Sequence, residues 1–276
     1  MNLISRIWNS SLGKKYIMAL TGAALFAFVI GHLIGNLQVF GPPEMINRYA
    51  HFLKSTPELL WVVRLGLLAC VFLHIASAVT LSALNKEARP EPYAGKSAYG
   101  STAASRYMLV SGLVIAAFVV YHLAHFTALL PGINGVGDFR ELTTVLHGET
   151  VPDVHAMMVL GFQVWWVVLF YLVAQAMLFM HLSHGVAAMF QSLGFRNHVW
   201  WPRVQCLAKC ASIALFAGYA AIAIGLFMRV GIDSDYVDMV RRRAAGMAMD
   251  DKPPQSAREV IASVKQGLEA SGKEAK

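Results

Sequence analysis

Acidic residues are missing from the hydrophobic part of this 276-residue chain. Four stretches contain no aspartate or glutamate: 16–40, 59–84, 106–130 and 156–229. Proton routes through membranes usually rely on buried carboxylates and histidines, so this absence argues against a carboxylate-based proton route here. Charged residues make up only 14% of the chain and hydrophobic residues 57%. This balance excludes an ordinary soluble domain.

Cysteine is also scarce, and its spacing excludes two kinds of site. The three cysteines are Cys70, Cys206 and Cys210, and no two of them form a CxxC motif. A CxxC redox or metal site and covalent attachment of a c-type haem through CxxCH are therefore excluded. All three cysteines lie in or beside apolar stretches, where we interpret them as packing residues. The net charge of +7 is dispersed, and without an aromatic-interleaved basic patch it does not predict nucleic-acid binding.

Five apolar stretches are long enough to cross a membrane, which takes about 20 residues for a hydrocarbon core of about 30 Å. The mean hydropathy of the chain is +0.52. We therefore predict an all-α fold, an integral membrane bundle of five transmembrane helices with short interfacial helices. The expected spans are residues 16–40, 59–84, 106–130, 156–190 and 205–229. We expect no cleavable signal peptide, because the first apolar stretch is too long and lacks a clear cleavage motif after it.

The connecting segments predict the topology. Lysine and arginine predominate in segments 1–15, 85–106 and 191–204, whereas 41–58 is balanced and 131–155 is acidic. Because basic loops stay in the cytoplasm, the first three segments should face inward, with the N-terminus cytoplasmic and the C-terminal tail outside.

We divide the chain into a five-helix membrane domain, residues 1–230, and a polar tail, residues 231–276, with a possible short amphipathic helix expected in its 250–276 part. Between the spans, Pro42 and Pro43 precede apolar residues at helical spacing and predict an interfacial helix. Asp138, followed three residues later by Glu141, predicts another short helix. No internal repeat is expected.

Histidine is the polar residue that stands out within the spans. Six of the ten histidines fall there: His32, His74, His122, His125, His181 and His184. An ionisable residue inside a membrane is a functional candidate by default, and a helical bundle can hold haem between imidazoles on facing helices. Hydrogen bonding between helices would account for one or two such histidines, but poorly for six. We therefore predict haem ligation.

The depth of each histidine sorts the ligands into pairs. His32 and His122 each lie nine residues before the expected outer end of their helix, roughly 13 Å deep at 1.5 Å per residue. His74 and His181 lie roughly 18 and 15 Å from the inner end. Since successive helices alternate in direction, His32 and His122 should bind an outer haem iron, and His74 and His181 an inner one. His125 is one turn too shallow to pair with His32, and we expect it to support a ligand or pack; depth alone does not assign His184.

Five segments of the chain form a recognisable set: "VIGHLIGN", "NRYAHFLKSTPELLWVVR", "LHIASA", "YHLAHF" and "HLSHGVAAMFQSLGF". They resemble the di-haem cytochrome b membrane anchor of succinate:quinone oxidoreductases, in its five-helix, single-subunit form. The resemblance covers about residues 1–230, and its last motif is the most specific. It implies ligands at His32, His74, His122 and His181, the first histidine of the last motif, and leaves His184 as a neighbour.

The resemblance also implies a function and partners. The chain would be one subunit of a succinate dehydrogenase or fumarate reductase in a bacterial-type inner membrane. A flavoprotein with the dicarboxylate site and an iron-sulfur protein would dock on its cytoplasmic face. The chain itself would have no catalytic residue and would pass electrons through two haem b groups to or from a quinone, of which menaquinone is one candidate.

A quinone head group needs a hydrogen-bond donor and a proton source near the outer haem. Arg48, His51 and Lys54 are the candidates, although these side chains would equally suit lipid head groups. Three other functions stay open. The chain could be the cytochrome b of a hydrogenase or formate dehydrogenase, a histidine-relay transporter, or an anchor whose haem passes no electrons. Transporters usually show repeats and broken helices, which are not expected here.

Overall fold

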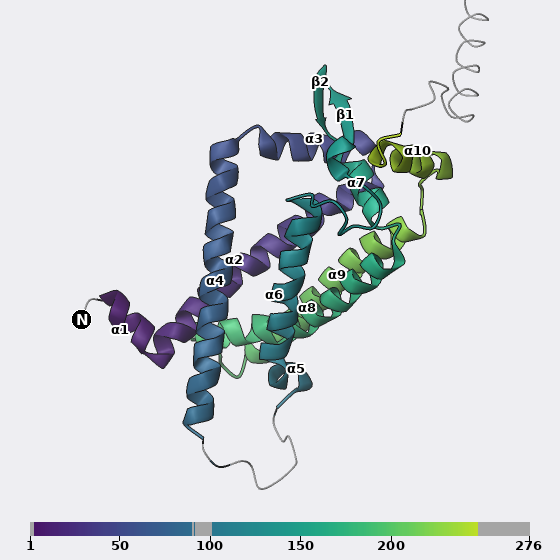
Figure 1. Ribbon diagram of the computed structural model, residues 1–276. Coiled ribbons are helices and arrows are strands. Elements are labelled where there is room, and N and C mark those ends of the chain that lie inside the picture. The colour runs from purple at the N-terminus through teal and green to yellow at the C-terminus, as the bar shows by residue number, and fades with distance from the viewer. Residues whose placement is uncertain (1–2, 90, 92–100, 248–276) are drawn as a thin grey trace, which may run out of the picture.

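The computed structural model describes residues 3–89, 91 and 101–247, and five long helices form its body (Figure 1). Each of the five is long and apolar enough to cross a membrane, so the chain is a multi-pass, all-α membrane protein, as predicted. A 3-10 turn, η1 (Gln38–Phe40), continues the first of them. The five are α2 (Ser11–Leu37), α4 (Pro57–Glu87), α6 (Met108–Phe126), α8 (Trp165–Ser192) and α9 (Trp201–Phe227).

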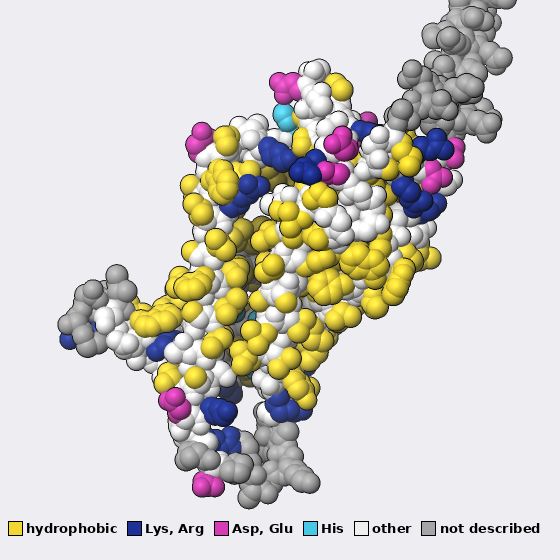
Figure 2. Space-filling view, in the orientation of Figure 1, with side chains coloured by type: hydrophobic (Ala, Val, Ile, Leu, Met, Phe, Trp, Pro, Cys, Tyr) yellow, Lys and Arg dark blue, Asp and Glu magenta, His cyan; other side chains and the backbone are white. Residues whose placement is uncertain are grey.

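The surface of the bundle carries an apolar belt. Figure 2 shows hydrophobic side chains over the middle of the face in view, with charged side chains gathered toward the two ends. Val62, Phe72 and Val120 are 68%, 70% and 70% exposed, respectively. Soluble proteins rarely expose continuous apolar surface of this extent, so this belt is the surface that lipid would cover.

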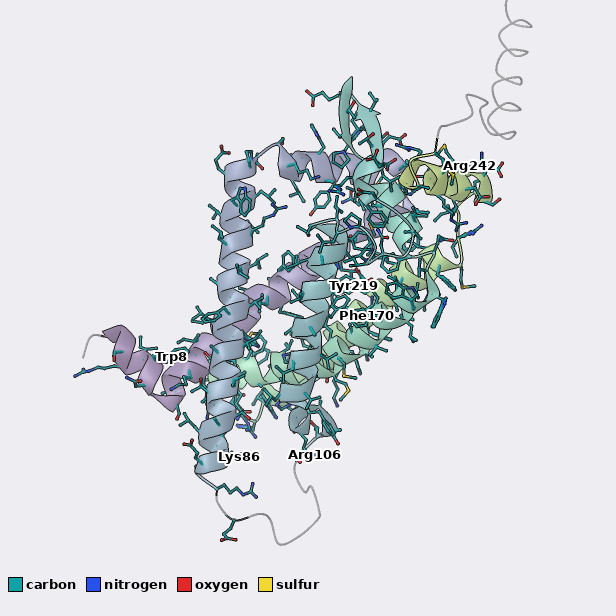
Figure 3. The ribbon with its side chains drawn as sticks, viewed as in Figure 1. Trp8, Lys86, Arg106, Phe170, Tyr219 and Arg242 are labelled. Atoms are coloured by element: carbon teal, nitrogen blue, oxygen red, sulfur yellow. The ribbon has the colours of Figure 1, made fainter. Side chains whose placement is uncertain are left out.

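The two ends of the bundle differ in what they carry. One end holds α1 (Leu3–Asn9) and α5 (Ala103–Arg106), and Figure 3 labels Lys86 and Arg106 there. We call this the α5 end. The opposite end, the α10 end, holds four helical segments and a β-hairpin. These are α3 (Pro43–Lys54), η2 (Phe139–Glu141), β1 (Thr143–Leu146), β2 (Glu149–Pro152), α7 (Val154–Gly161) and α10 (Ser234–Ala244).

The helix predicted in the first long loop is confirmed as α3. Tyr49 packs against Gly35 of α2 so closely that a Cβ at Gly35 would lie 2.7 Å from the tyrosine ring. The buried Asn47 side chain donates to Asp153 Oδ1 (3.0 Å) and accepts from the His155 backbone N–H (3.0 Å). These contacts fix α3 to α2 and to the start of α7.

The expected span 156–190 is wrong at its first part, because the chain there forms two helices. Helix α7 ends at Gly161 and α8 begins at Trp165. Residues of α7 are buried on every side, including Ala156, Val159 and Leu160, each 0% exposed. A helix enclosed by protein in this way belongs to the packed layer at the α10 end, and α8 alone spans.

The short helix predicted from Asp138 and Glu141 is present as the 3-10 helix η2, a single turn. Asp138 is its N-cap and accepts a hydrogen bond from the Arg140 backbone N–H. An antiparallel hairpin comes next, with Thr143 opposite Pro152 and Leu146 opposite Glu149. His147 and Gly148 connect its strands with φ of 53° and 86°, the left-handed pair that a two-residue type I′ turn requires.

The packed part of the chain continues past residue 230 into α10. Val237 and Val240 are fully buried, and Arg243 lies 3.6 Å from Asp153 and donates to the Thr143 carbonyl. Because breaking a buried ion pair leaves an uncompensated charge, this contact holds α10 against α7 and the hairpin. The amphipathic helix expected within 250–276 lies outside the described residues.

Candidate functional site

The structure brings the predicted histidines together as two pairs of facing imidazoles. His32 on α2 and His122 on α6 have ring centroids 5.7 Å apart, and we call them the outer pair. His74 on α4 and His181 on α8 have centroids 6.3 Å apart, and we call them the inner pair. These are the pairs that the depth argument predicts, although their binding of iron stays a prediction.

The other two intramembrane histidines lie apart from these pairs. His125 is 1% exposed and stacks on Phe126 and Phe139, with centroid distances of 4.0 and 5.5 Å. It therefore does not face His32. His184 lies one turn beyond His181 on α8 and is partly buried.

The hydrogen bonds of His74 fix which of its nitrogens carries the proton. Its Nδ1 lies 3.0 Å from the Met18 carbonyl oxygen, and a carbonyl can only accept. Thr21 Oγ1 lies 3.3 Å from the same nitrogen and gives its own proton to the Ile17 carbonyl (2.7 Å). Nδ1 is therefore the protonated nitrogen, and Nε2 keeps a free lone pair.

His181 shows the same arrangement on the opposite side of the inner pair. Its Nδ1 lies 3.2 Å from Ser111 Oγ, and the same hydroxyl lies 3.0 Å from the Met108 carbonyl oxygen. When the serine donates to that carbonyl, the imidazole donates to the serine, and Nε2 again keeps a lone pair. Histidines that bind metals commonly have their other ring nitrogen held in this way.

A glycine follows each of these hydroxyl residues and lies against an imidazole. A Cβ on Gly22 would lie 3.2 Å from His74 Cε1, and one on Gly112 would lie 3.3 Å from His181 Cε1. Glycine at these two positions lets each imidazole approach the neighbouring helix. Thr21, Gly22, Ser111 and Gly112 were not singled out in the sequence analysis.

An internal repeat would have revealed them, and the expectation of none is wrong. Residues 21–33 read "TGAALFAFVIGHL" and residues 111–123 read "SGLVIAAFVVYHL". Residues 72–79 and 179–186 read "FLHIASAV" and "FMHLSHGV". Helix α2 thus corresponds to α6, and α4 to α8. Each imidazole pair joins equivalent positions of the two halves.

The residues fit haem by their number, their chemistry and the space around them. Among the described residues, no group of three or more His, Cys, Asp or Glu side chains could hold a metal ion, so each pair suits a metal whose other ligands belong to a cofactor. Imidazole nitrogens bind metals at about 2 Å, so two imidazoles on opposite sides of one ion have ring centroids about 6 Å apart. The separations in the two pairs, 5.7 and 6.3 Å, are close to this value. The most apolar part of α4 has no buried residue, and Figure 2 shows an opening between α4 and α6.

The quinone candidates Arg48, His51 and Lys54 all lie on α3. His51 Nε2 is 3.9 Å from Glu149 Oε2 of the hairpin, whereas Arg48 and Lys54 are exposed. Although much of the Lys54 side chain is exposed, partial burial of its ammonium lowers its pKa, and the nearby Arg64 charge lowers that pKa further. The structure does not gather these three side chains around a common cavity.

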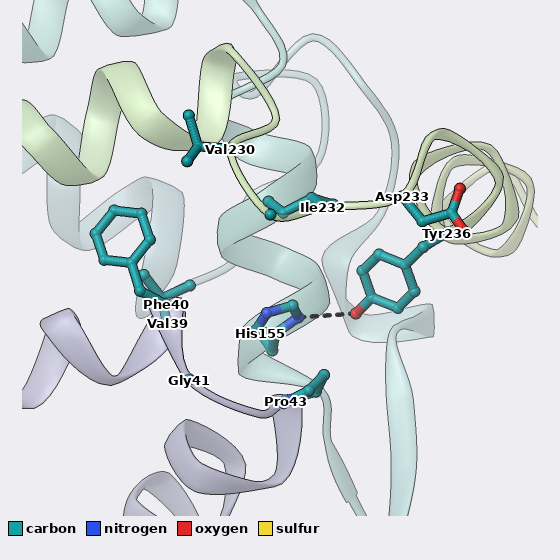
Figure 4. Close-up of a pocket in the computed structure, with 10 residues that line it drawn as sticks. Val39, Phe40, Gly41, Pro43, His155, Val230, Ile232, Asp233 and Tyr236 are labelled. Atoms are coloured by element: carbon teal, nitrogen blue, oxygen red, sulfur yellow. Dashed lines mark hydrogen bonds between the residues drawn. The ribbon is translucent and has the colours of Figure 1, made fainter.

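A cavity of about 200 Å³ lies instead where η1, α3, α7 and the start of α10 meet (Figure 4). His155 and Tyr236 face each other there, with 2.9 Å between the imidazole Nδ1 and the hydroxyl. Burial lowers the pKa of His155 and raises that of Tyr236, so both are neutral near pH 7. The sequence did not reveal this cavity, because His155 lies just before the expected span 156–190 and Tyr236 lies in the expected polar tail, residues 231–276.

Comparisons with protein-family models, with curated proteins and with solved structures find no match to this chain.

Proposed function

We propose that the chain is the di-haem cytochrome b anchor subunit of a succinate:quinone oxidoreductase. The observation that carries this proposal is the presence of two pairs of facing imidazoles at two depths of a membrane bundle. In the inner pair both Nδ1 atoms are committed to hydrogen bonds, which leaves both Nε2 atoms able to bind iron. The choice of this enzyme among di-haem cytochromes is supported by the segments that resemble its anchor, above all "HLSHGVAAMFQSLGF".

The chain's own residues would hold the haems and keep water away from them. His32 and His122 would bind one iron, and His74 and His181 the other. When bound, haem supplies one-electron transfer at a potential that its ligands and their hydrogen bonds adjust. Residues 16–40, 59–84, 106–130 and 156–229 contain no carboxylate. Electrons would therefore cross the membrane without protons following a carboxylate route through this chain.

Partners would occupy the two ends of the bundle. The basic residues of the α5 end, including Lys86 and Arg106 (Figure 3), support a cytoplasmic placement in a bacterial inner membrane. The iron-sulfur subunit would dock there and link this chain to the flavoprotein that binds the dicarboxylate. Quinone would react at the α10 end, near the outer pair, where Arg48, His51 and Lys54 on α3 and the cavity beside Tyr236 offer polar groups.

A reduced-minus-oxidised visible spectrum of the purified protein tests the proposal. We expect two b-type haems per chain that titrate at distinct potentials, together with co-purifying flavin and iron-sulfur subunits. A chain without haem would contradict the proposal. Haem accompanied by hydrogenase or formate dehydrogenase subunits would favour the alternative di-haem cytochrome.

The repeat removes one argument against a histidine-relay transporter, because many transporters contain repeats. Transporters also usually have broken helices, and this chain does not show them in its five spans. Each apolar span is a continuous helix: α2, α4, α6, α8 and α9. The facing geometry of the imidazoles also favours metal binding over a relay. The same spectrum decides, because a transporter would bind no haem.

Cysteine labelling tests the proposed orientation. In a chain whose three native cysteines are replaced by alanine, we expect Val145→Cys on the hairpin to react with a membrane-impermeant maleimide in intact cells, since Val145 is 67% exposed at the α10 end. Asn85→Cys at the α5 end is the control and should react only after the membrane is broken. The reverse pattern would invert the topology.

A further inference from the structure

The hydroxyl of Tyr171 lies between the partly buried imidazole of His122 and the buried imidazole of His125. Tyr171 Oη is 3.1 Å from His122 Nδ1 and 3.1 Å from His125 Nδ1. Tyr171 is 4% exposed and His125 is 1% exposed. The three side chains therefore form a short hydrogen-bonded chain that water does not reach, and one end of it is a histidine of the outer pair.

The chain of hydrogen bonds has a favoured direction when His122 binds a metal. A hydroxyl has one proton and two lone pairs, so Tyr171 can accept from one imidazole while it donates to the other. If His122 Nε2 binds iron, its Nδ1 carries the proton and donates to Tyr171. The arrangement that also uses the tyrosine proton has Tyr171 donating to His125 Nδ1, which places the His125 proton on Nε2. That atom is buried and has no hydrogen-bond partner among the described residues.

We propose that Tyr171 is a positioning residue for the outer haem, with His125 as the terminal acceptor of its proton. The inference rests on the proposed haem ligation by His122. By accepting from His122 Nδ1, Tyr171 fixes the orientation of this imidazole and increases its electron donation to the iron. Greater donation favours the oxidised metal, so the contact lowers the midpoint potential of the outer haem.

His125 strengthens this effect because hydrogen bonds in a chain polarise one another. A tyrosine that donates to His125 has a more electron-rich oxygen and is a better acceptor for His122. No hydrogen bond to a ring nitrogen of His32 is found among the described residues, so Tyr171 would be the group that adjusts the outer pair. Sequence reasoning left His125 as a supporting or packing residue, and this arrangement gives it a specific partner.

Spectroelectrochemical titration of the complex in membranes tests the proposal. For Tyr171→Phe we expect two haems per chain, an outer-haem potential above that of the wild type, and an unchanged inner-haem potential. Tyr219→Phe is the matched control. Its ring centroid lies 6.4 Å from that of His32, but its hydroxyl donates to the Val29 carbonyl at 2.7 Å and contacts no imidazole nitrogen. Removing this second hydroxyl (Figure 3) should leave both potentials unchanged.

His125→Phe provides an independent measurement, because a phenyl ring can keep the stacking on Phe126 and Phe139 while removing the acceptor. We expect a smaller upward shift of the outer potential than in Tyr171→Phe. An outer potential that stays the same or falls in Tyr171→Phe, with both haems present, would overturn the inference and leave haem ligation intact. If Tyr171→Phe loses the outer haem, the His125→Phe variant tests the inference instead. An outer-haem potential unchanged in His125→Phe would refute the proposed hydrogen bonding from His122 through Tyr171 to His125. A wild-type protein without haem would refute the proposed function itself.

Discussion

His181→Ala is expected to remove the inner haem and leave the outer haem in place. His181 faces His74 across 6.3 Å between ring centroids, and an alanine leaves the inner iron with a single protein ligand. It also leaves Ser111 without its imidazole partner. Haem content should fall from two per chain to one, and a redox titration should lose one of its two components.

His184→Ala is the control for this change, because it removes a histidine from the same helix one turn away. His184 has no facing imidazole partner among the described residues, and we expect its variant to keep both haems at wild-type potentials. Two haems in His181→Ala together with one in His184→Ala would show that the assignment of the ligand is wrong.

Gly112→Leu is expected to abolish the inner haem by displacing its ligand. A Cβ at Gly112 would already lie 3.3 Å from His181 Cε1, so the rest of a leucine side chain has no room unless the imidazole moves. Leucine favours the helix more than glycine does, so the backbone of α6 should tolerate the change. Gly22→Leu should act in the same way through His74. The measurement is haem content and the redox titration of each variant.

Gly31→Leu is the matched control. A Cβ at Gly31 would meet no atom within 4 Å, and the equivalent position in the second half of the repeat is occupied by Tyr121. This variant should keep both haems. The contradicting result would be a Gly112→Leu variant that keeps the inner haem at full content and unchanged potential. It would show that close packing of His181 against Gly112 is not needed for haem binding.

The spans and the histidine pairs could be predicted because each depends on one helix at a time. Length and hydropathy identify a helix that can span, and a constant rise per residue converts the position of His32 or His74 into a depth. Alternating helix direction then matches the depths without any knowledge of packing. Thr21, Ser111 and Gly112 were also within reach of the sequence, since the repeat marks all three.

The rest depends on contacts between distant segments, which the sequence does not display. The division between α7 and α8 follows from the burial of α7 beneath the layer at the α10 end. The docking of α10 depends on Arg243 meeting Asp153 and Thr143. Tyr171 is one of many aromatic residues on apolar helices, and nothing in its local sequence shows that it faces His122 and His125. The quinone candidates on α3 stay a prediction for the same reason.

The sequence correspondence between α2–α4 and α6–α8 relates two helical hairpins of one chain. Each pair of facing imidazoles, His32 with His122 and His74 with His181, takes one histidine from either hairpin. A single helical hairpin carries one imidazole of each pair and completes neither, whereas two paired copies would complete both. The arrangement is what duplication and fusion of a gene for a self-pairing helical hairpin would produce. Departures from symmetry, such as Tyr171 in place of Arg64, would then be later specialisations of one half.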